Sequence, residues 1–165
     1  MSRVYVAAGS NVDPEVNLSR ALDALRRIFP RLTVSSCYRN RAVGFEGDDF
    51  LNLVVGFDTE RGVDEVIAEL HAVEAECGRS RDAPKWAPRP MDLDILLFDD
   101  LVCDTPSLHL PRPDLLKRAY MLGPLAEIAP DEIHPTAHRS IGMLWSGFDQ
   151  AAHPLQRVTL PVRQR

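Results

Sequence analysis

The chain has 165 residues, of which 45% are hydrophobic and 26% are charged, and its formal net charge at pH 7 is −5. This length suits one well-buried domain and is short for two, and the composition is that of an ordinary globular protein. The net acidity argues against nucleic acid as the main partner. No apolar run reaches the length of a membrane span.

The cysteines Cys37, Cys77 and Cys103 are odd in number and widely spaced. This pattern fits neither a disulfide framework nor a zinc site. We therefore predict reduced thiols that pack in the interior of a cytoplasmic protein. The N-terminus agrees with this location, because it turns polar too soon after Met1 for a signal peptide.

The N-terminal part of the chain predicts a strand followed by a helix. Residues 3–8 alternate between the two faces of a strand and are rich in β-branched side chains. Asp13 is placed to cap the following helix, and Pro14 suits its first helical position. Pro30 ends this helix. Its apolar face is expected to hold Leu18, Leu22, Leu25 and Phe29.

Two more strands follow. Residues 32–38 predict the second strand, and residues 40–49, which contain two glycines, predict a long loop. Residues 50–57 form a nearly continuous apolar run that predicts the third strand. Asn52 is the one strongly polar residue in this run, and strand alternation places it on the same face as Phe50.

Apolar residues at helical spacing predict a second helix over residues 63–77, which leads into a fourth strand at residues 92–98. The resulting order over residues 1–99 is β-α-β-β-α-β, which is the ferredoxin-like arrangement. We therefore predict an α+β fold with an antiparallel sheet and both helices on one side. Residues 100–149 are expected to add strands and helices to this single domain, and residues 150–165 to form a strand-like or loosely held tail.

Within the added part, residues 101–103 and 107–110 are expected to pair as short strands. Pro113-Asp114 is expected to open a helix, which Gly123-Pro124 then interrupts. A last short helix is predicted over residues 140–145, with its tryptophan in the core.

The fourth strand carries two carboxylates on one face, because successive strand side chains alternate. Asp92 and Asp94 are on this face, and Leu93, Ile95 and Leu97 are expected on the other. With α-carbons roughly 6 to 7 Å apart, two such charges repel by roughly 0.6 kcal/mol in water and about 2.5 kcal/mol at an effective dielectric near 20. A solvated strand face is one interpretation. A site for Mg²⁺, which is often shared between one or two carboxylates and substrate phosphates, is the other.

Basic and aromatic residues gather just before these carboxylates. Guanidinium groups bind phosphate oxygens bidentately, and an indole can cover a flat heterocycle. The prolines in this segment indicate a loop. The pattern favours a polyphosphate with its metal over a surface loop that is merely kept soluble by its charges. The cluster consists of Arg79, Arg81, Lys85, Trp86 and Arg89.

Together these motifs resemble the 6-hydroxymethyl-7,8-dihydropterin pyrophosphokinase family. The segment Arg89-Pro90-Met91-Asp92-Leu93-Asp94-Ile95-Leu96 is similar to the family signature R-P-x-D-L-D-I-L. The resemblance extends from the first strand to about Pro130. It is supported by Gly9-Ser10-Asn11, by Ser35-Ser36-Cys37-Tyr38-Arg39 and by Pro124-Leu125-Ala126-Glu127-Ile128-Ala129-Pro130.

The resemblance implies transfer of the pyrophosphoryl group of ATP to the hydroxymethyl oxygen of the pterin, with release of AMP, in folate biosynthesis. ATP is then a co-substrate, and two Mg²⁺ ions held by Asp92 and Asp94 would bridge its phosphates. The implied catalytic residues are Arg79, Arg89, Asp92 and Asp94. The implied partners are these small molecules, with neither nucleic acid nor a membrane among them, and the oligomeric state stays open.

The resemblance also implies two sets of binding residues. ATP is expected at Glu74, Arg79, Arg81, Trp86, Arg89, Ile95 and Arg118. The pterin is expected at Asn40, Val43, Phe50, Asn52, Trp86 and Tyr120. In the second set, Phe50 and Tyr120 form an aromatic sandwich, and the amide of Asn52 offers a donor and an acceptor to the pterin edge. Taken without the resemblance, both rings are equally compatible with the core, and Asn52 with a satisfied polar residue near a sheet end.

The chain departs from the family pattern at several points. Asn40-Arg41-Ala42-Val43-Gly44 replaces the usual Thr-Pro-Pro-Leu-Gly, which removes two prolines that would stiffen a substrate loop. Leu110-Pro111-Arg112-Pro113 replaces a segment that commonly reads Pro-His, so Arg112 is a candidate phosphate contact in place of a histidine. In the aromatic pair, Phe stands where Tyr is common and Tyr where Phe is common. The loop from Gly44 to Asp49 is expected to close over bound substrates.

Two other functions are compatible with these residues. The same metal pair could serve a Mg²⁺-dependent phosphotransferase that acts on another alcohol and releases ADP. The fold could also serve a non-catalytic pterin- or nucleotide-binding module, which would release no AMP. Neither a P-loop nor the glycine-rich loop of protein kinases is present. No general base is identified, and an alcohol can lose its proton late in a loose transition state.

Overall fold

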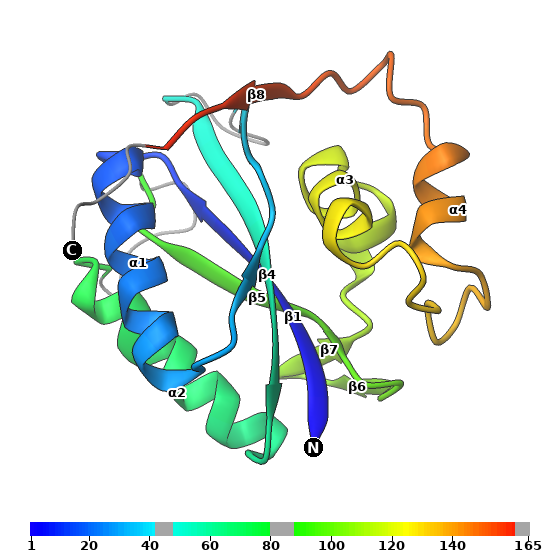
Figure 1. The fold of residues 1–165 in the computed structure, drawn as a ribbon, viewed down its shortest axis with the longest axis horizontal. Coiled ribbons are helices and arrows are strands. Elements are labelled where there is room, and N and C mark those ends of the chain that lie inside the picture. Colours follow the sequence, from blue (N-terminus) through cyan, green and yellow to red (C-terminus); the bar gives the residue numbers. More distant parts are fainter. Residues whose placement is uncertain (42–47, 80–87, 161–165) are drawn as a thin grey trace.

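The computed structural model describes residues 1–41, 48–79 and 88–160. Helices α1 (Pro14–Ile28) and α2 (Val63–Glu76) cover one face of an antiparallel sheet, and α3 (Ala119–Ile128) lies on the other face (Figure 1). Helix α4 (Ile141–Ser146) lies beyond α3, away from the sheet. Within these described ranges, no helix combines the length and apolar character that crossing a bilayer requires.

The main sheet has the strand order β5-β1-β4-β3-β8, with the short strand β2 beside β4. The first four strands of this order, together with the element order along the chain, confirm the predicted ferredoxin-like core. The tail contributes β8, which adds to the outer edge of β3 and so confirms the strand-like part of the tail prediction. The strands are β1 (Ser2–Ser10), β2 (Thr33–Val34), β3 (Cys37–Asn40), β4 (Phe50–Thr59), β5 (Asp92–Phe98) and β8 (Gln156–Val158).

The prediction of one continuous second strand was wrong, because two serines interrupt it between β2 and β3. The Ser35 amide donates to the carbonyl of Val54 at 2.9 Å, and the Ser35 hydroxyl accepts from the Val54 amide at 2.8 Å. A side-chain oxygen thus replaces a backbone carbonyl in the ladder. The next amide, that of Ser36, leaves the sheet and donates to Glu127.

Helix α1 has the predicted apolar face, and Leu18 and Leu25 are both 0% exposed. The prediction that the Asp13 side chain caps this helix was wrong. Asp13 stands at the N-cap position in a left-handed conformation with φ 39°, and its side chain makes no capping bond. Its backbone carbonyl accepts from the Asn17 amide at 2.9 Å. The left-handed turn at Asp13 therefore begins the helix through the backbone alone.

The sheet separates two cores. Alternate residues of β1, such as Val4 and Val6, face α1 and α2, whereas Tyr5 belongs to the core under α3. On β5 the alternation is broken, because the register with β1 shifts between Ile95 and Leu97. Leu97 consequently joins the core under α3, and the prediction that it shares a face with Leu93 and Ile95 was wrong.

The added part contains the predicted pair of short strands, β6 (Cys103–Thr105) and β7 (Leu108–Leu110). The predicted single helix after Pro113 is in fact two elements, a 3-10 helix η1 (Pro113–Leu116) and α3. The break falls at Arg118, whose backbone is extended and whose carbonyl accepts from the amides of Met121 and Leu122. Pro124 lies inside α3 and does not interrupt it.

The remaining core predictions were partly right. The thiols of Cys37 and Cys77 are buried, whereas Cys103 is only partly buried because the β6–β7 hairpin lies at the surface. The last short helix is confirmed, but Trp145 is only partly buried. Its ring packs on α3 at Gly123, where an added Cβ would lie 2.9 Å from the ring. Trp145 therefore joins α4 to α3 instead of filling the core.

We expect Leu25→Ala to lower the free energy of unfolding by about 2–5 kcal/mol, because it leaves a cavity between α1 and the sheet. Val16→Ala on the same helix is the matched control, since Val16 is 50% exposed. Urea denaturation monitored by circular dichroism measures both. A loss below about 1 kcal/mol for Leu25→Ala would contradict the packing described here.

Candidate active site

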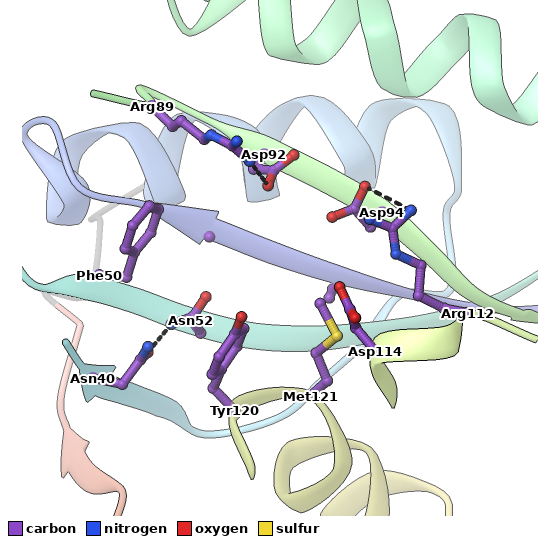
Figure 2. A pocket seen from close by; sticks show the side chains of 12 residues that line it. Asn40, Phe50, Asn52, Arg89, Asp92, Asp94, Arg112, Asp114, Tyr120 and Met121 are labelled. Carbon is purple, nitrogen blue, oxygen red and sulfur yellow. Dashed lines mark hydrogen bonds and ion pairs between the residues drawn. The ribbon is translucent and has the colours of Figure 1, made fainter. Parts of the chain in front are cut away.

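Helix α3 covers only part of the second face of the sheet, and the uncovered part forms an open pocket (Figure 2). Strands β1, β3, β4 and β5 supply its floor and walls, and η1 and α3 supply its other side. Predicted pterin and metal residues therefore meet in one place. The lining residues are Ala7, Gly9, Asn40, Phe50, Asn52, Arg89, Asp92, Asp94, Arg112, Asp114, Tyr120 and Met121.

Asp92 is held by two arginines, one at each carboxylate oxygen. Arg79 Nη1 donates to Oδ1 at 2.9 Å, and Arg89 Nη1 donates to Oδ2 at 3.0 Å. Arg79 also donates to Glu74 Oε2 at 2.7 Å. Burial disfavours the charge of Arg79, but the carboxylates of Asp92 and Glu74 outweigh it and raise the pKa of the guanidinium. The charge of Asp92 is thus compensated within the protein.

Glu74 supports this arrangement from behind the pocket. Its side chain is 10% exposed, and its Oε2 also accepts from the backbone amide of Leu93 at 2.9 Å. Strand β5 lies at the edge of the main sheet, so this bond satisfies an amide that has no strand partner on that side. Glu74 thereby holds both the edge of β5 and the guanidinium of Arg79.

Asp94 lies in a different electrostatic environment from Asp92. The Arg112 guanidinium is 3.6 Å from its Oδ1. Burial, together with the charge of Asp92, outweighs this cation and raises the pKa of Asp94 to about 7. Near neutral pH the Asp94 carboxyl is therefore short of positive charge, and a cation in the pocket would stabilise its ionised form.

The two carboxylates fit a magnesium site completed by a ligand. In the part of the chain that the structure describes, no group of three or more His, Cys, Asp or Glu side chains could hold a metal ion. Mg²⁺ is commonly bound by one or two carboxylates, with substrate phosphates and water as its other ligands. Asp92 and Asp94 share the pocket face of β5, as their spacing predicted. The donor set therefore suits Mg²⁺ that arrives with a phosphorylated substrate.

The other end of the pocket carries amides and rings. The Asn52 side chain donates to Asn40 Oδ1 across the β3–β4 pair, and the Phe50 and Tyr120 rings point into the same pocket (Figure 2). A Cβ at Gly9 would lie 2.5 Å from Asn52 Oδ1, so only glycine allows the Asn52 amide to lie flat against β1. Burial raises the pKa of the Tyr120 hydroxyl, which keeps it protonated at neutral pH.

A second pocket adjoins the first and shares Asp94 and Arg112 with it. It lies between α2, β5 and the β6–β7 hairpin, and it contains the predicted nucleotide residue Ile95. Its other lining residues are Ile67, Leu70, His71, Leu93, Pro106, Ser107, Leu108 and His109. A ligand that spans both pockets must therefore pass Asp94 and Arg112.

Not every predicted site residue is placed. Val43, Arg81 and Trp86 lie outside the described residues, as do Lys85 and most of the predicted closing loop from Gly44 to Asp49. Arg118 is the N-cap residue of α3 and lines neither pocket. Its charge nevertheless acts on the Tyr120 hydroxyl, so it lies close to the first pocket.

The structural role of Asn11 was not predicted from the sequence. Its side-chain Oδ1 accepts from the backbone amide of Arg89 at 2.6 Å, and its backbone amide donates to the Arg89 carbonyl at 3.1 Å. This reciprocal pair fixes the Arg89 backbone at the end of β1. The Gly9-Ser10-Asn11 match was the available signal. Asp114 and Met121 were also missed, and no sequence motif marks them as lining residues.

Residues 5–130 match the family model described as "7,8-dihydro-6-hydroxymethylpterin-pyrophosphokinase (HPPK)". Two curated relatives carry the name "2-amino-4-hydroxy-6-hydroxymethyldihydropteridine pyrophosphokinase". The one from Aquifex aeolicus is 38% identical over 137 residues, which is 82% of this chain and 85% of the relative. The one from Pseudomonas aeruginosa is 40% identical over 135 residues, 79% of this chain and 83% of the relative.

Solved structures agree on the fold. A chain from a structure titled "Crystal Structure Analysis of the HPPK-DHPS in complex with substrates" matches with a TM-score of 0.70 at 12% sequence identity. A Plasmodium falciparum HPPK-DHPS A437G structure matches with a TM-score of 0.71, also at 12% identity. Our chain is 92% and 88% covered by these matches but spans only 44% and 45% of the longer solved chains.

We expect Asp94→Asn to stabilise the metal-free protein increasingly as the pH rises. The Asp94 carboxyl ionises near pH 3.8 when unfolded and near pH 7 when folded. The free energy of unfolding of the wild type therefore decreases as the pH rises between these two values. The asparagine variant has no carboxyl at this position and avoids this decrease. The gain over wild type should grow by at least about 1 kcal/mol from pH 4 to pH 7.5.

Urea denaturation in EDTA at several pH values measures this difference. Asp131→Asn, at an exposed position away from the pocket, is the matched control. A stability difference between Asp94→Asn and wild type that stays flat across this range would contradict the raised pKa of Asp94.

Proposed function

Since the chain belongs to the 7,8-dihydro-6-hydroxymethylpterin-pyrophosphokinase family, we propose that it transfers the pyrophosphoryl group of ATP to the hydroxymethyl oxygen of 6-hydroxymethyl-7,8-dihydropterin. The products are AMP and the pterin diphosphate, and the reaction belongs to folate biosynthesis. The observation that carries this proposal is that the two pockets meet at Asp94, which belongs to a carboxylate pair contacted by three arginines.

The first pocket is the acceptor pocket. Phe50 and Tyr120 offer aromatic faces to the pterin ring, and Asn52 offers an amide donor and acceptor to its polar edge. Because Asn52 donates to Asn40, its oxygen is oriented by β3, and both amides can meet the ligand. We assign Val43 and Trp86 to the same ligand on the family resemblance.

The second pocket takes the nucleotide. Ile67, Leu70 and Ile95 give it an apolar wall for a purine, and the arginines stand where the phosphates would run toward the acceptor. Arg79 and Arg89 already pair with Asp92, and Arg112 pairs with Asp94 where the two pockets meet. These arginines are therefore oriented before a phosphate arrives. We assign Glu74 to holding Arg79, and Arg81 and Arg118 to the phosphate path on the family resemblance.

Asp92 and Asp94 are the residues that would hold magnesium, and we propose two ions. When bound, such ions neutralise charge on the attacking and leaving oxygens of an in-line displacement. Asp94 gains most from this, because its ionised form has the weaker cationic partner in the protein. Asp92 is already paired with Arg79 and Arg89, and these arginines become available to phosphate oxygens if Asp92 turns to a metal.

The chain's own residues act mainly by positioning. The acceptor hydroxyl forms a bond to the β-phosphorus, and the bond from that phosphorus to the oxygen retained by AMP breaks. The hydroxyl proton leaves to solvent or to a phosphate oxygen late in the displacement, so no strong base is required. Arg89 and Arg112, which line the acceptor pocket beside the carboxylates, stabilise the charge that develops during transfer.

The free thiols support a reducing compartment. Cys37, Cys77 and Cys103 form no disulfide. Burial raises the pKa of Cys37 to about 11, which keeps this thiol inert at neutral pH. We propose a cytoplasmic location on this basis.

The purified chain, supplied with ATP, Mg²⁺ and the reduced pterin alcohol, is expected to release AMP in proportion to the alcohol added. Chromatography of the nucleotides measures this directly. Formation of ADP would favour simple phosphoryl transfer instead. Binding of the pterin without any AMP would favour the non-catalytic module.

We expect Asp94→Ala to lower kcat/KM by about a thousandfold or more, because one of the two proposed metal-binding carboxylates is removed. The fold should survive, since the change relieves repulsion with Asp92. The AMP assay and a thermal melt test both statements. Asp131→Ala is the control for an acid lost outside the pocket. Near-normal turnover of Asp94→Ala would rule out the assigned role.

A further inference from the structure

One carboxylate of α3 lies outside both pockets and binds the β2–β3 break. Glu127 Oε2 accepts from the Ser36 amide at 2.7 Å and from the Ser36 hydroxyl at 2.9 Å. Its Oε1 accepts from the Tyr38 hydroxyl at 2.6 Å. These donors outweigh the effect of burial and lower the pKa of Glu127, so the side chain is ionised at neutral pH. Three short bonds therefore tie α3 to the sheet.

The position of Glu127 in α3 is unfavourable for the helix itself. The helix ends at Ile128, and the negative end of the helix dipole disfavours a carboxylate in the last turn. Helix formation therefore does not explain an acid at this place, whereas the three donors on β2–β3 do. Glu127 also follows Tyr120 by seven residues, which is close to two helical turns. Both side chains thus leave α3 on the same side.

Glu127 binds Tyr38 of β3, and β3 is the strand that orients the polar end of the acceptor pocket. Tyr38 pairs with Asn52, and Asn40 pairs with Phe50, in the antiparallel β3–β4 register. The side chain of Asn40 also accepts from the Asn52 amide. Fixing Tyr38 therefore fixes the segment that presents Asn40.

The C-terminal segment reaches the same place from the outer edge of the sheet. In β8, Arg157 pairs with Tyr38 and donates to the Ser36 hydroxyl. This segment lies beyond residue 130, where the family match ends. We call the four residues Glu127, Ser36, Tyr38 and Arg157 the brace. It joins α3, the β2–β3 break and β8.

We propose that Glu127 is a positioning residue for the acceptor pocket. It holds the Tyr120 side of α3 at a fixed place relative to Asn40 and Asn52 on the sheet. The Tyr120 ring and the amides come from different layers, and the pocket between them has an open side, so their separation depends on how α3 docks. This inference rests on the proposed function for the identity of the ligand, and the brace itself rests on the contacts above.

We expect the loss of Glu127 to change KM for the pterin alcohol but not KM for ATP. Glu127→Ala should raise KM for the pterin alcohol by about tenfold. Without the carboxylate, the Tyr120 ring is no longer held at a fixed place relative to the amides of Asn40 and Asn52. KM for ATP should stay within about twofold, since the second pocket is built from α2, β5 and the β6–β7 hairpin. Glu127→Gln should restore most of the pterin affinity. Its oxygen can accept from Ser36, and its amide can donate to the Tyr38 hydroxyl.

Glu132→Ala is the matched control. Glu132 also accepts from a tyrosine hydroxyl, that of Tyr5, at 3.1 Å, but this bond lies away from the brace. It should leave the ratio of the two KM values unchanged. An equal rise in both KM values for Glu127→Ala, a Gln variant as impaired as the Ala variant, or the same ratio change in the control would overturn the proposal.

Hydrogen exchange gives a readout that needs no turnover. Without ligands, the amides of residues 37–40 should exchange faster in Glu127→Ala than in wild type or in Glu132→Ala. Absence of AMP release by the wild type would contradict the proposed function but not the brace. Unchanged hydrogen exchange in Glu127→Ala, together with normal turnover of the wild type, would contradict the positioning role of Glu127 but not the proposed function.

Discussion

The repulsion between Asp92 and Asp94 is the constraint around which the rest of the site is built. Strand alternation places both carboxylates on the pocket face of β5, and the protein neutralises them unequally. Asp92 has a guanidinium nitrogen within 3.0 Å at each oxygen, whereas, among the residues that the structure describes, the guanidinium nitrogen paired with Asp94 is 3.6 Å away. The unmet need for positive charge is therefore concentrated at Asp94. This is also the point where the two pockets meet, so the electrostatics and the shape indicate the same place for the phosphates.

The fold creates room for this charge by covering the sheet unevenly. Helices α1 and α2 bury one face, while α3 packs over only part of the other (Figure 1). On the uncovered part, the pocket between β4 and β5 is lined by Ala7 and Gly9 of β1, whose small size leaves space for a ligand. A larger residue at Gly9 would collide with Asn52. Small residues on β1 thus allow the functional side chains of its two neighbours, β4 and β5, to face a common ligand.

Periodicity predicted those parts of the structure that depend on one segment at a time. It placed Asp92 with Asp94, Asn52 with Phe50, and the buried faces of α1 and α2. It failed where a distant partner decides. Leu97 changes face because β1 imposes a register shift, and the second strand divides because Ser35 bonds with Val54. The bond between Asn11 and Arg89 joins residues 78 positions apart, and no local pattern encodes such a contact.

The brace and the strand pairing together explain how this chain can do without the two prolines that the family resemblance leads us to expect after the second strand. A proline stiffens a loop by restricting the backbone before any ligand binds. Here the residue at the start of that loop, Asn40, is still within β3, is paired with Phe50 and is bonded to the Asn52 side chain. Glu127 holds the same strand from α3, and β8 holds it at its outer edge. Rigidity at the pterin end of the pocket is therefore supplied by tertiary contacts instead of by local backbone restriction.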